Sequence, residues 1–269
     1  MKSSIIDNVK SLPPLSSTIV NINKIYSDEN STIRDMANVI EHDPMIIANI
    51  LKIANSPLYG FGREIKNPAQ AVALFGMNMT RSIAIGNSVR KLLNVDMQPY
   101  GVTSDEFAHI SSLQATLMLN WYKKIDRHKA EKLYLAAFLQ ETGKILIASE
   151  VIQNDESISF ASEVENSNNL AMVEKAYSNA TCGEVTALIF KHWGFDSEFI
   201  EMIKYSDNPS SAPHEIKEYA TALNIVKTII PINKPLSEMS INFGLKIAGD
   251  AGYNVELLES TVNAMLELL

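Results

Sequence analysis

Side chains that could do acid–base, nucleophilic or metal chemistry are sparse in this chain of 269 residues, which has five histidines and one cysteine. Cys182 falls in the first turn of a predicted helix, where the pKa of a thiol can be lowered. No histidine is its neighbour in the sequence, so we expect a buried thiol and no nucleophile. His192, near the end of the same helix, is expected to be a helix-terminal cation or a satisfied core imidazole. The His42-Asp43 pair is explained by Asp43 as the cap of a helix that starts at Pro44.

One further stretch, Phe138-Leu139-Gln140-Glu141-Thr142-Gly143-Lys144, brings opposite charges together. Glu141 and Lys144 are three residues apart, and neighbours at that spacing lie on the same face of a helix. The spacing therefore predicts an ion pair between these two side chains.

The elements that must position these side chains are helices throughout. The chain is organised around the stretch from Asp43 to Gly60, in which apolar residues from Ile46 to Ala54 recur at helical spacing and Asn55-Ser56-Pro57 ends the helix. Further helices are predicted at about 15–26, 32–40, 67–76, 78–93, 104–121, 129–140, 182–193, 197–205, 215–230, 237–248 and 255–269. No strand alternation is sustained, so the fold class is all-α.

Two capping boxes mark helix starts in the second half of the chain. Thr103 with Glu106, and Thr181 with Glu184, have the spacing at which hydroxyl and carboxylate satisfy backbone donors reciprocally. The preceding segment, 94–102, contains a proline and a glycine and is expected to separate two helical subdomains.

Several short motifs occur in the order found in HDOD domains, the HD-related output domains of bacterial signalling proteins. The chain resembles these domains at Leu12-Pro13-Pro14-Leu15, Ala54-Asn55-Ser56, Tyr59-Gly60, the Ala-rich helix from Ala69 to Gly76, and Arg81-Ser82. The resemblance covers roughly Leu12 to Pro209 and implies an HD-domain-like bundle of many helices. We expect an N-terminal subdomain at 1–94, an HD-like subdomain with a degenerate metal site at 103–209, and a C-terminal helical extension at 210–269.

The same resemblance places a metal site that this chain has lost. HD-superfamily phosphohydrolases hold divalent metals with His and Asp ligands, and the metal activates water for attack on phosphorus. Their central Leu-Leu-His-Asp-Ile-Gly-Lys resembles the stretch described above, in which Gly143 and Lys144 remain. The matching degenerate positions are Ser111, Gln140, Glu141, Cys182, Tyr205 and Ser206. His109 is half a turn from Ser111 and would point to another face. We therefore expect no catalytic residue, no metal ligand and no cofactor.

A candidate interaction loop follows the Pro44 helix. Asn55, Ser56 and Tyr59 are expected to tie the backbone down by hydrogen bonds, with a contact surface for a partner as the other interpretation. Arg81 could equally hold a helix end or meet an anionic partner.

Composition limits the class of protein further. Apolar residues make up 46% and charged residues 20%, as in an ordinary globular protein. Residues 1–94 hold 10 Lys/Arg against 7 Asp/Glu, and residues 95–269 hold 13 against 24, for a net charge of −8. This acidic balance argues against nonspecific nucleic-acid binding. Short apolar runs, the lack of an export signal and the single cysteine together favour a cytoplasmic protein that does not enter a membrane.

The resemblance implies a non-enzymatic regulatory or protein-interaction module of bacterial signal transduction, whose partner is another, unidentified signalling protein. Two alternatives stay open. One is a residual metal-dependent phosphohydrolase that uses Glu141 with His109 and His192, and the other is binding of a nucleotide or small anion in the vestigial pocket without turnover. A homodimer through the last helix is less favoured than packing onto the core, because its apolar seam lasts only about two heptads.

Overall fold

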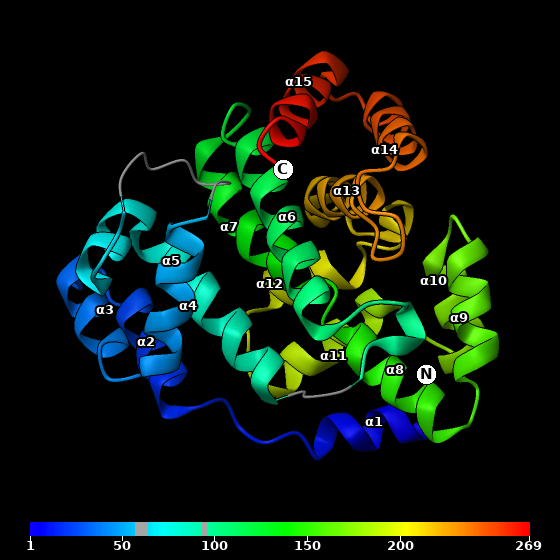
Figure 1. The fold of residues 1–269 in the computed structure, drawn as a ribbon, viewed down its shortest axis with the longest axis horizontal. Coiled ribbons are helices and arrows are strands. Elements are labelled where there is room, and N and C mark those ends of the chain that lie inside the picture. The colour runs from blue at the N-terminus through cyan, green and yellow to red at the C-terminus, as the bar shows by residue number, and fades with distance from the viewer. Residues whose placement is uncertain (57–63, 93–95) are drawn as a thin grey trace. The chain divides into compact units, whose positions relative to one another are not determined.

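The computed structural model describes residues 1–56, 64–92 and 96–269, and every regular element in those ranges is a helix (Figure 1). The predicted all-α fold class is confirmed. Contacts group the chain into two compact units, which we call unit 1 (Met1–Leu12 with Leu93–Val262) and unit 2 (Pro13–Leu92 with Asn263–Leu269). This grouping differs from the predicted partition, because the first helix and most of the segment after 210 pack within the same unit as 103–209.

Unit 2 contains four helices of the described chain: α2 (Ser17–Ser27), α3 (Ile33–Ile40), α4 (Pro44–Ala54) and α5 (Pro68–Leu92). Asp43 caps α4 as predicted, since its Oδ1 accepts the backbone N–H groups of Met45 and Ile46 at 3.1 and 3.2 Å. Gly76 divides α5 with a φ of 74°, which lies in the left-handed region that favours glycine. The two segments on either side of it correspond to the two helices predicted there.

Unit 1 is the larger bundle. It contains α1 (Ser3–Lys10), η2 (Gln98–Tyr100), α6 (Ser104–Tyr122), α7 (Arg127–Leu139), α8 (Gly143–Gln153), α9 (Ser157–Asn166), α10 (Leu170–Ser178), α11 (Cys182–His192), α12 (Ser197–Lys204), η3 (Pro209–Ser211), α13 (His214–Ile229), α14 (Glu238–Asp250) and most of α15 (Val255–Leu266). The predicted capping boxes at Thr103 and Thr181 are both confirmed. Helices α1, α8, α9 and α10 were not among the helices predicted from the sequence.

Helix α8 is the element that places polar chemistry inside unit 1. Its first six residues, Gly143 to Ala148, are all buried, and it packs against α11, α10, α9 and α1. Gly143 allows α8 and α11 to approach closely, because a Cβ atom there would lie 2.4 Å from the carbonyl oxygen of Cys182. The residues just before and after Gly143 are therefore held against the start of α11.

Two smaller predictions concern the packing of the last helix and the possibility of a membrane span. In α15, the seam residues Leu258, Val262 and Met265 are buried within this chain, as expected for packing onto a core. Among the described residues, no helix combines the length and the apolar character needed to cross a bilayer.

Candidate functional site

Five charged side chains from five segments meet inside unit 1 and form what we call the charge row: Glu174, Lys144, Glu141, Lys227 and Asp207. Lys144 Nζ lies 3.2 Å from Glu141 Oε2 and also contacts Glu174 Oε1. Lys227 Nζ lies 2.6 Å from Asp207 Oδ1 and 4.0 Å from Glu141 Oε2. The signs alternate along the row, and Glu141 is shared by both lysines. The predicted ion pair between Glu141 and Lys144 is confirmed, with both side chains 2% exposed.

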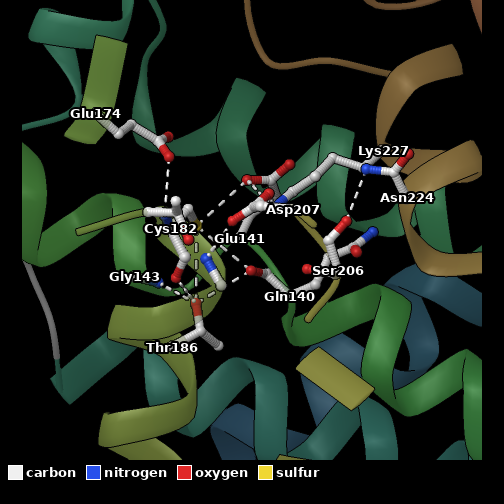
Figure 2. Close-up of polar contacts among 12 residues, drawn as sticks. Gln140, Glu141, Gly143, Glu174, Cys182, Thr186, Ser206, Asp207, Asn224 and Lys227 are labelled. Carbon is white, nitrogen blue, oxygen red and sulfur yellow. Dashed lines mark hydrogen bonds and ion pairs between the residues drawn. The ribbon is translucent and has the colours of Figure 1, made fainter. Parts of the chain in front are cut away.

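The two ends of the charge row are fixed by the start of α11. Glu174 Oε2 accepts the backbone N–H of Cys182 at 2.8 Å (Figure 2). Asp207 Oδ2 accepts the backbone N–H of Gly183 at 2.7 Å. Both are first-turn donors of a helix, which have no partner within the helix and interact well with negative charge. Glu174 also accepts a hydrogen bond from the buried Tyr100 hydroxyl at 3.2 Å. The row is therefore built into the backbone as well as into side-chain pairs.

Burial opposes ionisation of every group in the row, but for four of the five the neighbouring charges set the direction of the pKa shift. Although burial works against it, the ammonium groups of Lys144 and Lys227 lower the pKa of Glu141, and Lys227 lowers that of Asp207. The carboxylates in turn raise the pKa of both lysines, again against burial. Only for Glu174 does burial prevail and raise the pKa of the carboxyl group.

A pair of buried amides lies beside the row. Gln140 Nε2 donates to Gln114 Oε1 at 2.8 Å, and Gln114 Nε2 donates to Glu141 Oε1 at 3.2 Å and to the carbonyl oxygen of Ile230 at 2.8 Å. Gln140 Oε1 and Ser206 Oγ are buried with no hydrogen-bond partner among the described residues. The Gln140 amide, predicted to stand at the histidine of the His-Asp signature, is thus engaged with a second amide.

A pocket of about 490 Å³ opens over the charge row. All five members of the row line it, together with the start of α10, the end of α13, the following loop and α14. Met239, Phe243 and Ile247 of α14 give it an apolar wall, while Asn169 and Asn224 contribute amides. Its volume is typical of a small-molecule site, and its floor carries the perturbed titratable groups described above.

Four of the six predicted degenerate positions lie at this site. Gln140, Glu141 and Cys182 are in mutual contact, with Cys182 Sγ 3.4 Å from the Gln140 carbonyl oxygen and 3.6 Å from Glu141 Oε2 (Figure 2). Ser206 is buried beside them, and its carbonyl oxygen accepts a hydrogen bond from Asn224 Nδ2 at 2.7 Å. Tyr205 is half-buried, and its hydroxyl pairs instead with Lys204 Nζ at 3.3 Å.

The position predicted for the first family ligand is used differently. The hydroxyl of Ser111 is buried and donates within α6 to the carbonyl oxygen of Phe107 at 3.0 Å. Gln114, almost one turn later on α6, is the residue that reaches Gln140 and Glu141.

The other candidate side chains behave as structural groups. Cys182 is fully buried as expected, but burial raises the pKa of its thiol, so the lowering considered for a helix start is wrong. His109 and His192 are both exposed, and His192 Nε2 lies 3.3 Å from the carbonyl oxygen of Leu12. His42 is exposed next to the capping residue Asp43.

The candidate interaction loop is only partly described. The side chain of Asn55 ties the loop down as predicted, because its Nδ2 donates to the carbonyl oxygens of Leu51 and Ile65 and its Oδ1 accepts the Ile65 N–H. The backbone N–H of Ser56 donates to the carbonyl oxygen of Ile53 at 3.1 Å, and Tyr59 lies outside the described residues.

Arg81, grouped with this loop, joins α5 to α2. Its Nε donates to Asn23 Oδ1 at 2.7 Å, and its guanidinium carbon lies 4.3 Å from the centre of the Tyr26 ring. These contacts hold two helices of unit 2 together.

The donor set of the site does not fit the divalent metals of HD-superfamily enzymes. Such ions need imidazole or carboxylate ligands with free lone pairs, and an ammonium group cannot be a ligand. Here the carboxylates of Glu141 and Asp207 face Lys227, and Gln140 is an amide. In the described ranges, no cluster of three or more His, Cys, Asp or Glu has an arrangement that could hold a metal ion.

Sequence reasoning missed four members of the site: Gln114, Glu174, Asp207 and Lys227. Three of them lie on helices among buried residues, as Lys227 does between Val226 and Ile229. Asp207 directly follows the predicted pair Tyr205-Ser206. A charged residue on an otherwise buried helix face was the available signal, since such residues are buried only when paired.

Comparisons with known proteins agree with the fold. The HDOD domain pattern matches residues 12–209, the range in which the resemblance was seen. A virulence factor of Campylobacter jejuni subsp. jejuni shares 26% identity over all of both chains, with a TM-score of 0.59. A candidate phosphohydrolase of Shewanella amazonensis shares 21% identity over 98% of this chain and 94% of its own, with a TM-score of 0.77.

Two longer proteins are also similar. A candidate signal transduction protein of Marinobacter aquaeolei shares 19% identity with a TM-score of 0.72, and 99% of this chain matches 59% of that one. An uncharacterized protein of Treponema pallidum is 20% identical over 224 residues, which are 81% of this chain. The chain spans 42% of the length of that curated relative.

Proposed function

This chain belongs to the HDOD domain family, and from that premise we propose that it is a regulatory module of bacterial signal transduction that binds another signalling protein and turns over no substrate. The name of the similar Marinobacter protein supports a signalling role. That protein is longer than this chain, as expected if the domain works together with other modules.

The observation that carries the proposal is the pairing within the charge row. A metal-dependent phosphohydrolase needs carboxylates that are free to bind metal and a metal that generates hydroxide. In this site, Lys227 lies between Asp207 and Glu141, while Lys144 lies between Glu141 and Glu174. These carboxylates already have cations bound to them, and the chain supplies both cations itself.

A hydrolysis assay tests the absence of turnover. The wild-type protein is incubated with bis-p-nitrophenyl phosphate and Mn²⁺, Fe²⁺, Mg²⁺ or Zn²⁺, with Glu141→Gln as the matched control. We expect the same background rate for both proteins with every metal. A saturable, metal-dependent rate that disappears in Glu141→Gln would instead establish the phosphohydrolase alternative.

Protein binding is tested by reciprocal capture. We expect a partner recovered with the tagged chain to form a complex of fixed stoichiometry when the two purified proteins are mixed and separated by size. If the chain forms no such complex and the hydrolysis assay gives metal-dependent turnover, the proposed role is wrong.

A second candidate function is favoured by the pocket: binding of a small molecule without turnover. The apolar wall of α14 suits a flat apolar group, and the amides of Asn169 and Asn224 suit polar substituents. The floor carries three carboxyl groups against two ammonium groups. This balance disfavours a nucleotide phosphate placed directly over the floor, and favours a neutral or cationic group there.

Thermal unfolding distinguishes these ligands. Nucleosides, nucleoside monophosphates and inorganic phosphate are compared for the rise they cause in the unfolding midpoint. Phe243→Ala should abolish any rise caused by binding in the pocket. Ile158→Ala, at an 89% exposed position on α9 that does not line the pocket, serves as the control.

A further inference from the structure

Lys227 pairs with one carboxylate and lies within reach of a second. Its Nζ lies 2.6 Å from Asp207 Oδ1 and 4.0 Å from Glu141 Oε2, so one positive charge stands between two carboxylates from different segments. Figure 2 shows the Lys227 side chain reaching toward Asp207 and Glu141. The convergence of carboxylates on one point is the arrangement that hard divalent cations use.

The surroundings of this point suit an ion as well. Glu141, Asp207 and Lys227 all line the pocket, and the Lys227 side chain is 12% exposed, so the point can be reached from solvent. Asn224 and Thr228 line the same side of the pocket and carry oxygen atoms. Mg²⁺ and Mn²⁺ are commonly held by one or two carboxylates with water completing the shell.

Lys227 also balances the charge of the row. The row has three carboxylates and two ammonium groups, and without Lys227 only Lys144 would remain for all three. Asp207 would keep one neutral donor, the Gly183 N–H at 2.7 Å. A buried carboxylate in that state needs a proton or another cation.

We propose that the ammonium group of Lys227 occupies a divalent-cation site and closes it permanently. A short neutral side chain at position 227 uncovers this site, whose ligands are the carboxylates of Glu141 and Asp207 with water from the pocket. The inference does not depend on the signalling role, because it concerns how the centre of unit 1 is neutralised.

The test is a titration with Mn²⁺ of the full chain and its variants, followed by calorimetry and by the signal of free Mn²⁺ in electron paramagnetic resonance. We expect Lys227→Ala to bind one Mn²⁺ saturably and the wild type to bind none in the same range. Binding should raise the unfolding midpoint of Lys227→Ala by several degrees at about 100-fold excess over Kd. The wild-type midpoint should not move.

Two controls isolate the cause. Lys227→Arg keeps a cation between the carboxylates and should bind no Mn²⁺. The double variant Lys227→Ala with Asp207→Asn removes one proposed ligand together with the unpaired charge, so it should fold without metal and bind at least tenfold more weakly than Lys227→Ala.

Three results would overturn the proposal. One is a wild-type protein that binds Mn²⁺ as tightly as Lys227→Ala, since Lys227 would then not fill the site. Another is a folded Lys227→Ala protein that binds none. The third is a Lys227→Ala protein that stays unfolded at every Mn²⁺ concentration while the double variant folds, because a cation at this point should restore the missing charge.

Discussion

Replacing Lys144 with methionine should lower the free energy of unfolding of unit 1 by about 3–5 kcal/mol. Methionine is unbranched and similar in length, so the packing volume changes little. The change removes the ammonium group between Glu141 and Glu174 at a side chain that is 2% exposed. Removing one partner of a buried pair leaves charge uncompensated.

This magnitude converts into a shift that is easily measured. At about 2 °C per kcal/mol for a chain of this size, the thermal midpoint should fall by about 6–10 °C. The two tryptophans of the chain, Trp121 and Trp193, both belong to unit 1. Their fluorescence during urea and thermal unfolding therefore reports the unit that contains the substitution.

Charge and packing are separated by a second substitution and by pH. Lys144→Met combined with Glu174→Gln removes one unpaired carboxylate and should recover about 1–2 kcal/mol of the loss. The deficit of the single variant should also shrink as the pH falls, because burial raises the pKa of Glu174 and its protonation removes the unpaired charge. A loss below about 1 kcal/mol, or a larger loss unaffected by both changes, would refute the electrostatic reasoning.

Three further predictions concern the same bundle. The free energy of unfolding should be level from about pH 6 to 9 and fall below about pH 4, as urea titrations at each pH would show. The pKa values of Glu141 and Asp207 are lowered, so their contribution to the free energy of unfolding is lost as they become protonated at low pH. The pKa of Glu174 is raised, so protonation of Glu174 at falling pH favours the folded state. Gly143→Ala should lower the free energy of unfolding by about 2 kcal/mol or more, because the new Cβ would lie 2.4 Å from a backbone carbonyl oxygen of α11. Gly249→Ala is the control and should be tolerated, because its Cβ would meet only a valine methyl group at 3.3 Å. Thr181→Ala should cost about 1 kcal/mol by removing the hydroxyl that accepts the Glu184 N–H, and Thr181→Ser should retain most of that in the same unfolding assay.

Features that depend on near neighbours in the chain were predictable from the sequence. The cap at Asp43, both capping boxes and the break at Gly76 are formed within a few residues, so the residue types specify them. The pair Glu141–Lys144 is equally local in the sequence, although Glu141 lies in the turn before α8 and not on a helix face. Helix α10 was missed, and in the structure it packs against α8 and α9.

The sequence by itself determined most of the helices and the family, because both depend on residue type and local spacing. Only the tertiary structure decided which charged side chains meet inside unit 1. Lys227 and Asp207 are 20 residues apart, and Glu174 and Lys144 are 30 apart, so nothing local links them. Their pairing follows from the packing of α8, α10 and α13 around the start of α11, which brings isolated charges into a region where each is stable only beside its opposite.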